Sequence, residues 1–444
     1  MKVLIYTKET APRYKNVMYY GDWSIGDEEG NFYPEQIPAD QITHLNFAFL
    51  DFDSQGELKF CNDDRLLQFP QILEQIDEMP MGIRLLQSLN KIRRENANLR
   101  LGISVGGWAK SGDFTPVASD AKIRSRFIEN IIMFLKYMEL DYVDLDWEFP
   151  GEKRFGDAID DINDEGTPYG AIEDREYFTL LLKELRQALD SCEVKEGKYY
   201  ELTVTLPAGA ARLEGCIDVK SVFETVDFVS MMTYDFHGPW ENRAMHQSAL
   251  YKNAKDPMGA AGFAVDTCVD YLLSKGVAAE KIIVGVAFYT RGWEKVQDNG
   301  GVSGLPGLFG KAQMVNQDVD KSDTFGADNF LPVRKGYGGR KGGVWAYRTI
   351  EALKERYPGL VYYFDEEAKA PYYYSENGAF FTFDDSASIE AKALYVKEKG
   401  LGGLIGWMQS QDAQSNKESK VRDALTRSMK EGLYGSAELN KYKE

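Results

Sequence analysis

The chain has 444 residues, of which 43% are hydrophobic and 27% charged, a balance typical of a folded globular protein and not of a disordered, fibrous or membrane-spanning one. The formal net charge of −18 would repel a phosphate backbone or an anionic lipid surface, and the sequence carries no large Lys/Arg cluster to oppose that field. We therefore expect no nucleic acid and no membrane as partners, and a neutral substrate fits better.

Side chains that bind metals or form disulfides are few. Cys61, Cys192, Cys216 and Cys268 lack the short spacing of a zinc site or a disulfide framework, so buried or free thiols are expected. The three histidines leave little room for a metal site or a catalytic triad, and His44, which precedes an apolar run, is predicted to be structural. Chemistry must then rest on carboxylates and tyrosines, and we expect no metal and no cofactor.

The first fifteen residues contain an apolar run of only four, too short for the hydrophobic segment of a secretory signal. Localisation therefore stays open. We expect an extracellular protein if the sequence is a trimmed form, and a cytoplasmic one otherwise.

Eight short apolar runs, each able to form a strand, alternate along the chain with amphipathic stretches that have helical spacing. The runs cover residues 17–21, 44–50, 99–105, 142–149, 202–208, 228–235, 282–289 and 402–408. This alternation is typical of parallel βα units. Eight such units predict an α/β fold, namely a closed (β/α)8 TIM barrel.

Over a hundred residues separate the seventh and eighth predicted strands, more than one helix needs. They include a glycine-rich stretch at 300–310 and aromatic runs such as VYYFDEE and PYYYSENGAFFTF. We predict a small α+β insertion domain at 291–369, a barrel formed by 15–290 and 370–430, and a loosely held polar tail at 431–444. The insertion should lie on the C-terminal face of the barrel, where active sites form.

The segment DYVDLDWEF at residues 141–149 is the most informative one. Alternate residues of a strand share a face, so Asp144, Asp146 and Glu148 lie together while the apolar residues between them face the helices. Such a cluster is costly, because buried charges need partners and like charges raise one another's pKa. Perturbed carboxylates gather at active sites, which favours a functional interpretation, with a calcium or magnesium site as the alternative.

Glu148, the last of the three acids, is the best candidate for a catalytic acid. A raised pKa lets a carboxyl group protonate a glycosidic oxygen at neutral pH, and barrel enzymes place such groups at the C-terminal ends of strands. A retaining glycosidase commonly has a second carboxylate about 5 Å away across the scissile bond, whereas Asp146 is a neighbour on the same strand. The absence of a protein nucleophile is therefore predicted, which indicates assistance by the substrate.

Several motifs then match a known family. The segment DYVDLDWEFP at 141–150 resembles the DxxDxDxE signature of family 18 glycoside hydrolases, the chitinases and their relatives. SVGGW at 104–108 resembles their SxGG segment, and MMTYDFHGPW from residue 231 resembles their MxYD segment. GVAFYTRGW from 285, FTFDD from 381 and LGGLIGWMQSQD from 401 extend the resemblance from about residue 17 to the last helix. The inserted region resembles that of the deep-cleft, bacterial-type chitinases.

The resemblance implies retaining, substrate-assisted hydrolysis of β-1,4-linked N-acetylglucosamine polymers and oligomers, in which the 2-acetamido carbonyl attacks its own anomeric carbon. By position, Glu148 would be the acid and later the base, Asp146 would hold the acetamido N–H, and Asp144 would share a proton with Asp146. Tyr234 would bond to the acetamido oxygen, and Asp235 would help to shape the floor under the sugar.

The same resemblance implies a set of substrate contacts. Tryptophans offer flat faces on which a pyranose ring stacks, although each aromatic residue of the set could equally pack in the core. The expected contacts are Tyr20, Phe49, Trp108, Met232, Trp240, Tyr289, Arg291 and Trp407.

The sequence is compatible with three hypotheses about function. The first is a monomeric chitinase that binds chitin or chitooligosaccharides. The second keeps the chemistry but changes the substrate, to a glycoprotein glycan for an endo-β-N-acetylglucosaminidase or to a cell-wall glycan. The third is a catalytically inactive chitinase-like sugar-binding protein, but such proteins usually lose the acidic glutamate, and Glu148 is present.

Overall fold

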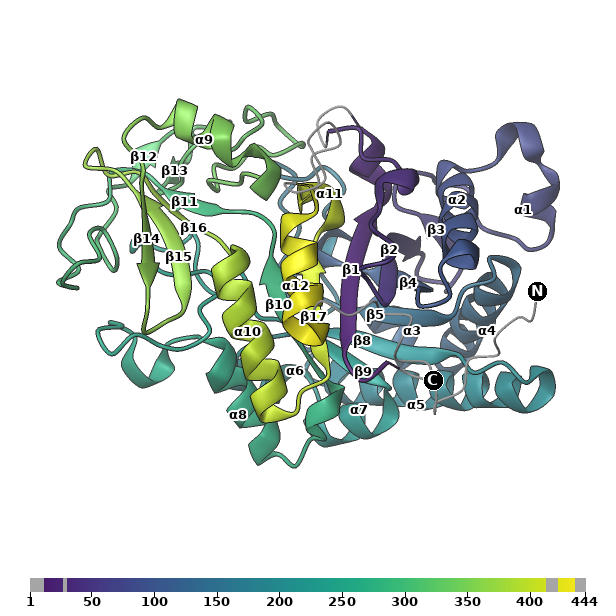
Figure 1. Ribbon diagram of the computed structural model, residues 1–444. Helices are drawn as coiled ribbons and strands as arrows, with labels where there is room; N and C mark the ends of the chain where they lie inside the picture. Colours follow the sequence, from purple (N-terminus) through teal and green to yellow (C-terminus); the bar gives the residue numbers. More distant parts are fainter. Residues whose placement is uncertain (1–11, 27–29, 413–421, 436–444) are drawn as a thin grey trace.

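The computed structural model describes residues 12–26, 30–412 and 422–435, and within them eight parallel strands close into a barrel (Figure 1). The strands pair in the order β1-β17-β10-β9-β8-β5-β4-β2, and pairing between β1 and β2 completes the ring. This confirms the predicted TIM barrel. The strands are β1 (Lys15–Gly21), β2 (His44–Phe52), β4 (Arg100–Gly106), β5 (Tyr142–Asp146), β8 (Glu201–Pro207), β9 (Phe228–Met232), β10 (Ile282–Ala287) and β17 (Gly403–Trp407), and β3 (Leu58–Phe60) adds an antiparallel arm to β2.

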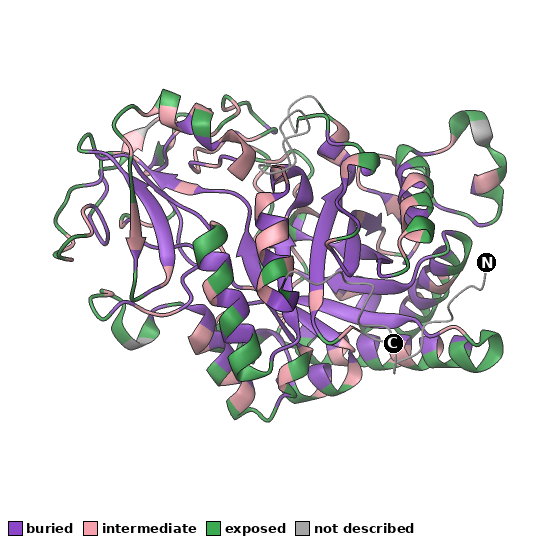
Figure 2. Cartoon of the chain, viewed as in Figure 1, coloured by how far each residue is buried: buried purple, intermediate pink, exposed green. Residues whose placement is uncertain are grey.

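Helices surround the barrel, and the faces that they turn outward are the exposed ones (Figure 2). The inside–outside alternation expected for β5 is present, because Val143, Leu145 and Trp147 belong to the core between strands and helices. The Trp147 ring stacks on Phe114 and meets Phe178 edge-on. The helices are α1 (Gln71–Glu74), α2 (Met81–Glu95), α3 (Phe114–Ser119), α4 (Ala121–Tyr137), α5 (Asp174–Glu196), α6 (Ala210–Cys216), α7 (Val219–Thr225), α8 (Val265–Ser274), α9 (Ile350–Arg356), α10 (Ser386–Lys399), α11 (Gln409–Asp412) and α12 (Ala424–Tyr434).

Buried charges at the N-terminal ends of the strands are matched by partners. The carboxylate of Glu201 accepts a hydrogen bond from Nε of Arg100 at 2.9 Å and lies 3.1 Å from Nε2 of His44. The side chain of His44 is buried, and its Nδ1 lies 2.9 Å from the Thr43 hydroxyl. His44 therefore has the structural position predicted for it.

An antiparallel sheet lies between β10 and β17 in the chain. It has the order β11-β16-β15-β14 and two small cores of its own around aromatic residues. Its strands are β11 (Arg291–Trp293), β14 (Val361–Asp365), β15 (Ala370–Tyr374) and β16 (Phe380–Thr382), and the short pair β12 (Val315–Asn316) and β13 (Asp323–Thr324) lies nearby in sequence. The sheet continues past the expected boundary at residue 369, and the division into domains stays a prediction.

The predicted tail begins too early. Helix α12 continues to Tyr434, whose ring packs edge-on against Tyr14 and whose hydroxyl donates to the Tyr14 carbonyl. Leu425, Met429 and Leu433 recur at one face of this helix and are buried, so its polar composition hid a regular apolar stripe. The rest of the predicted tail, 436–444, lies outside the described residues. No helix in the described part of the chain is long and apolar enough to cross a membrane.

Candidate active site

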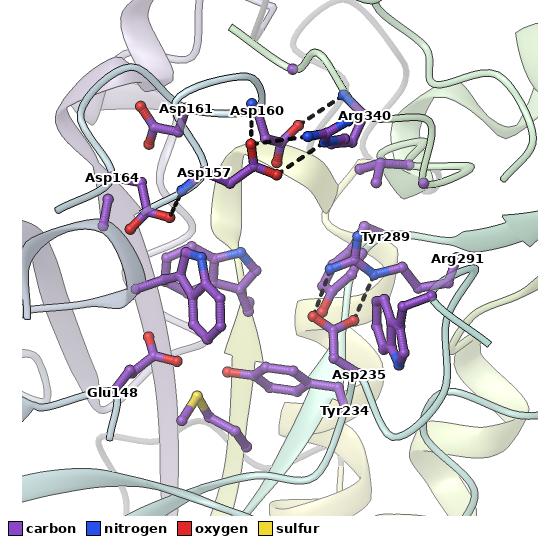
Figure 3. A pocket seen from close by; sticks show the side chains of 18 of the residues that line it. Glu148, Asp157, Asp160, Asp161, Asp164, Tyr234, Asp235, Tyr289, Arg291 and Arg340 are labelled. Atoms are coloured by element: carbon purple, nitrogen blue, oxygen red, sulfur yellow. Dashed lines mark hydrogen bonds and ion pairs between the residues drawn. The ribbon is translucent and has the colours of Figure 1, made fainter. Parts of the chain in front are cut away.

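A cleft of about 1780 Å³ opens at the C-terminal ends of the barrel strands. Barrel residues such as Glu148 and Tyr234 line it together with insertion residues such as Arg340, as expected for an insertion on this face (Figure 3). The cleft combines aromatic side chains with a smaller number of charged ones, which is typical of ligand sites.

The end of β4 is shaped so that β5 can present its acids. Gly106 has φ +103°, and a Cβ there would lie 2.5 Å from the carbonyl oxygen of Asp146. The next residue, Gly107, donates its N–H to that same oxygen at 2.8 Å. Ser111 follows, and its hydroxyl accepts the N–H of Glu148 at 2.9 Å. The glycine pair of the SVGGW motif and Ser111 therefore hold the backbone between Asp146 and Glu148.

Asp144 lies below the cleft and is saturated with hydroxyl donors. Ser104 and Thr203 are its direct neighbours across the sheet, and they donate at 2.8 and 2.6 Å. Tyr19 and Thr205 add bonds at 2.9 and 3.1 Å. Burial raises the pKa of Asp144, while the four hydroxyl bonds act in the opposite direction by stabilising the carboxylate.

Asp146 and Glu148 have no comparable support. Oδ1 of Asp146 is buried and has no hydrogen-bond partner among the residues that the structure describes. Burial raises the pKa of Asp146 well above its usual range, and the charges of Glu148 and Asp144 raise it further. Glu148 is partly buried at the cleft wall, and its pKa rises to about 7, chiefly because of burial. The two carboxyl groups of Asp146 and Glu148 therefore hold a proton near neutral pH. Oδ1 of Asp146 remains available to accept a hydrogen bond from a ligand.

Tyr234 and Asp235 follow β9 on the opposite side of the cleft (Figure 3). Gly285 on β10 permits the close approach of Tyr234, since a Cβ there would lie 2.8 Å from the tyrosine ring. Burial and the nearby Asp146 raise the pKa of Tyr234 well above its usual value, so its hydroxyl stays protonated and can donate. Both oxygens of Asp235 accept hydrogen bonds from Arg291, at 2.8 and 2.7 Å.

An aromatic cluster forms the floor of the cleft. Trp407, at the end of β17, stacks on Phe49 with ring centroids 5.8 Å apart and contacts the Tyr19 ring at 5.1 Å. Trp23 packs against both of these rings, with its centroid 6.1 Å from Phe49 and 6.3 Å from Trp407. These residues come from β1, β2, β17 and the turn after β1, and together they form an apolar aromatic surface that lines the same cleft as the acids.

Two tryptophans stand farther out along the cleft. Trp108 is 49% exposed and Trp240 is 56% exposed, which excludes a core role for either ring. The guanidinium of Arg154 lies 3.7 Å over the Trp108 ring, and that of Arg291 lies 5.4 Å from the Trp240 ring. Each cation holds its indole in place while a face or an edge remains open to solvent.

Comparison with known proteins identifies the family. The model for "Glycosyl hydrolases family 18" matches residues 15–412. The chain belongs to this family. It is 30% identical to chitinase A1 of Niallia circulans over 94% of its own length and 59% of that protein, and 29% identical to chitotriosidase-1 of Mus musculus over 90% and 73%. The family membership makes it a glycoside hydrolase.

Solved structures agree with this assignment. The fold superposes on chitinase ChiA74 from Bacillus thuringiensis with a TM-score of 0.79 and 28% identity, covering 95% of this chain and 70% of that one. A family 18 N-acetylglucosaminidase from Paenibacillus barengoltzii gives a TM-score of 0.70 and 27% identity, covering 95% of this chain and all of that one.

The family 18 cleft brings together most of the residues named from the sequence. The acids Asp146, Glu148 and Asp235 line it together with Tyr234, and Asp144 lies directly beneath. Seven of the eight expected contacts also line the cleft, namely Phe49, Trp108, Met232, Trp240, Tyr289, Arg291 and Trp407.

Tyr20 is the exception. Its ring is fully buried in the core outside the barrel, where its hydroxyl donates to the Phe32 carbonyl at 3.0 Å. Its neighbour Tyr19 faces inward and lines the cleft instead. Sequence reasoning also missed Arg154, Arg212 and Arg340 at the cleft wall. Both faces of β1 are apolar, so its sequence does not indicate which tyrosine faces the barrel interior, and no local pattern marks the arginines.

Proposed function

We propose that the protein hydrolyses chitin or chitooligosaccharides by a retaining, substrate-assisted mechanism. The observation that carries this proposal is the pair formed by Asp146 and Glu148: two adjacent carboxyl groups with raised pKa values at the wall of a large cleft with an aromatic floor, neither of which forms an ion pair with a residue that the structure describes. A glycosidase needs such an acid at the scissile bond.

Glu148 supplies the proton in the first step. With a pKa of about 7 it is substantially protonated at neutral pH, and it delivers this proton to the glycosidic oxygen as the C1–O bond breaks. The leaving sugar departs as an alcohol. In the second step the resulting carboxylate of Glu148 takes a proton from water, whose oxygen attacks C1 and breaks the bond between C1 and the acetamido oxygen formed in the first step, and the acid form of the glutamate is restored.

The nucleophile comes from the substrate in this proposal. Asp235 lies on the opposite side of the cleft from Glu148, but both of its oxygens are held by Arg291, which makes this carboxylate a poor nucleophile. The acetamido oxygen of the sugar attacks C1 instead and forms an oxazolinium ion. Tyr234 donates its O–H to the acetamido oxygen, and Asp146 accepts the acetamido N–H through its unused oxygen.

The floor and rim of the cleft fit a chain of neutral sugars. Trp407 underlies the position next to the acids, and the exposed rings of Trp108 and Trp240 offer further stacking surfaces. The net charge of −18 favours an uncharged polymer over an anionic one. A high-mannose glycan is branched, and no feature of the described cleft favours it over a linear chain.

The test is product analysis by mass spectrometry after incubation with chitohexaose and, separately, with a high-mannose glycopeptide. The Glu148→Gln variant is the control for contaminating activity. We expect short chitooligosaccharides from the parent protein and none from the variant. Cello-oligosaccharides, which carry a hydroxyl in place of the acetamido group, should remain intact. Proton NMR of the first product should show the β-anomer, because two displacements at C1 restore its configuration.

Cleavage of the glycopeptide but not of chitohexaose would replace the proposed substrate by a glycoprotein glycan. Tight binding of the hexamer without cleavage would overturn the proposed catalysis altogether. Cleavage of cello-oligosaccharides would contradict substrate assistance and implicate a protein nucleophile.

A further inference from the structure

A loop from the barrel meets the insertion across the cleft. Residues 157–162 follow β5, residues 336–340 belong to the insertion, and we call the two segments together the strap. Three backbone hydrogen bonds join them: Gly336 N–H to the Ile159 carbonyl at 2.7 Å, Ile162 N–H to the Gly336 carbonyl at 3.0 Å, and Gly338 N–H to the Asp160 carbonyl at 2.7 Å. The strap is therefore a short piece of antiparallel pairing between parts of the chain that lie far apart in sequence.

Arg340 fastens the strap with its side chain. Its Nε donates to one oxygen of Asp157 at 3.0 Å and another guanidinium nitrogen reaches the second oxygen at 3.3 Å. Its backbone N–H donates to the carboxylate of Asp160 at 3.1 Å. On the insertion side, the same guanidinium contacts both oxygens of Asp320 at 2.8 Å. Bidentate contacts of this kind are directional and stronger than neutral ones, so Arg340 joins both walls.

Both halves of the strap are built to hold this position. On the barrel side, Asp164 accepts hydrogen bonds from Arg154 at 2.6 Å and from the Asp157 N–H at 2.9 Å, which braces the loop on the pair β6 (Arg154–Phe155) and β7 (Gly166–Thr167). On the insertion side, a Cβ at Gly339 would lie 2.1 Å from the Ile159 carbonyl oxygen. A glycine there allows the two backbones to touch.

The strap faces the catalytic groups across the cleft. Asp157, Asp160 and Arg340 line the same cleft as Glu148 and Tyr234. Figure 3 shows the Asp157–Arg340 pair at one side of the open space, with Glu148 and Tyr234 at the other. The strap thus joins the barrel wall that carries Glu148 to the insertion and faces the acids across the open space.

We propose that the strap turns the cleft into a covered passage, which a sugar chain enters by an end, so that the enzyme acts on soluble chitooligosaccharides and chain ends in preference to the interior of a polymer. This inference rests on the proposed function. An uncovered cleft can bind a polymer at any point along the polymer chain. A covered cleft can bind it only if an end of the polymer threads through, or if the backbone pairing and the Arg340 contacts of the strap all break at once. Arg340 and Asp157 are then specificity-determining residues without a part in the chemistry.

The test opens the strap from each side with Arg340→Ala and with Asp157→Ala. Lys335→Ala is the matched control, because it removes one positive charge from an exposed position beside the strap. The readouts are kcat/KM on chitopentaose, and the fall in viscosity of high-molecular-weight glycol chitin per reducing end formed. An enzyme that cuts polymer interiors lowers viscosity with few cuts, and one that works from chain ends does not.

We expect the parent and the Lys335→Ala protein to lower viscosity little per reducing end. In both opened variants the fall in viscosity per reducing end should be about tenfold larger than in the parent. The reason is that the charge-assisted pair that keeps the strap closed is lost. The kcat/KM on chitopentaose should stay within about twofold of the parent, since the groups that touch the reacting bond are unchanged. Circular dichroism and the melting temperature confirm that the variants are folded.

A locked variant gives the converse test. Asp161 and Tyr337 are opposed in an antiparallel bridge, and cysteines at such positions are close enough for a disulfide. The oxidised Asp161→Cys/Tyr337→Cys protein should cleave chitopentaose at the parent rate. If oxidation abolishes this activity and a reductant restores it, the strap must open for every substrate and entry by an end is wrong.

The remaining outcomes are separable. A parent protein that lowers viscosity per reducing end as steeply as the opened variants overturns the covered passage and leaves the proposed function intact. A parent protein that cleaves neither chitopentaose nor glycol chitin overturns the proposed function, and the inference with it.

Discussion

Two groups of buried carboxylates occupy opposite ends of the same barrel. At the N-terminal end Glu201 is held by Arg100 and faces His44. At the C-terminal end Asp146 has a buried oxygen without a partner in the described chain, and no lysine or arginine touches Glu148 through a hydrogen bond that would hold it ionised. The two groups are buried by the same strands, so burial alone does not separate a structural acid from a catalytic one.

The difference lies in the partners. A buried carboxylate that serves the fold is matched by a cation, because an isolated charge costs several kcal/mol in the interior. A carboxylate that must exchange a proton near pH 7 is left unmatched and keeps a raised pKa. Asp144 shows a third solution, in which four hydroxyl groups replace the cation. Substitutions at the N-terminal end should therefore affect mainly stability, and substitutions at the C-terminal end should affect mainly activity.

The largest effect is expected at the C-terminal end, from Glu148→Gln. Loss of the proton donor should reduce kcat by about 10²–10⁴-fold, measured on chitohexaose. Stability should respond in the opposite direction. The folded-state pKa of Glu148 is raised to about 7, so ionisation opposes folding increasingly as the pH rises from its unfolded pKa toward 7.

The glutamine variant should therefore melt at a higher temperature than the parent at pH 8 and at nearly the same temperature at pH 4. Glu176→Gln, at an exposed position on α5, is the control and should change neither quantity. A variant that melts lower than the parent at pH 8 would show that the Glu148 charge stabilises the fold and would remove the contrast between the two ends.

Glu201→Gln should have the next largest effect, at the N-terminal end. It removes the charge that accepts the hydrogen bond from Arg100, and breaking a buried ion pair in this way costs about 3–5 kcal/mol of unfolding free energy. Chemical denaturation monitored by tryptophan fluorescence measures this loss, and kcat per folded molecule should stay unchanged. Lys136→Ala breaks an exposed pair with Glu196 and should cost less than about 1 kcal/mol. A large fall in kcat for Glu201→Gln would contradict the separation of roles.

Tyr234→Phe should affect catalysis with little change in stability. The hydroxyl is assigned to the acetamido oxygen as charge develops there, and loss of one such donor reduces kcat by about 10²–10³-fold. Tyr20→Phe removes a hydroxyl of the same kind from outside the barrel, and kcat on chitohexaose should not change. Equal losses in the two variants would mean that the Tyr234 effect is structural.

The smallest effect is expected from Arg212→Gln at the cleft wall. Activity requires protonated Glu148, so kcat/KM of the parent should fall as the pH rises through about 7. The positive charge of Arg212 lowers the pKa of Glu148, and its removal should move this alkaline limb to higher pH. A pH–rate profile with chitopentaose measures the shift, and a move to lower pH would contradict the assignment of the limb to Glu148.

Much of the fold could be predicted from the sequence because each barrel strand is a short run rich in apolar residues, and eight such runs leave few alternatives. The acids were readable because the period of two is strict from Val143 to Trp147. The inward turn of Tyr19 in place of Tyr20 was not, since both faces of β1 are apolar and the sequence does not distinguish the interior of the barrel from its outside. The predicted boundary of the tail fell inside helix α12 because polar residues lie between the buried residues of this helix in the sequence.

The strap could not be predicted from the sequence, for a different reason. Asp157 and Arg340 are separated by 183 positions, and each sits in a loop without periodicity. Their pairing depends on where the barrel and the insertion place their loops, which is a property of the whole fold. The saturation of Asp144 was also hidden, although its donors Ser104 and Thr203 follow once the register of β4, β5 and β8 is known.

The closure of the barrel has a consequence for how the protein is made. The β1 strand pairs with β2 early in the chain and with β17 near its end, and β17 also carries Trp407 at the cleft floor. While a ribosome extends the chain, β1 and β10 keep open edges until β17 emerges and fits between them. Such edges are prone to pair with other chains. The nascent protein should therefore depend on chaperones for most of its synthesis, and catalytic competence should arise abruptly when the last strand docks.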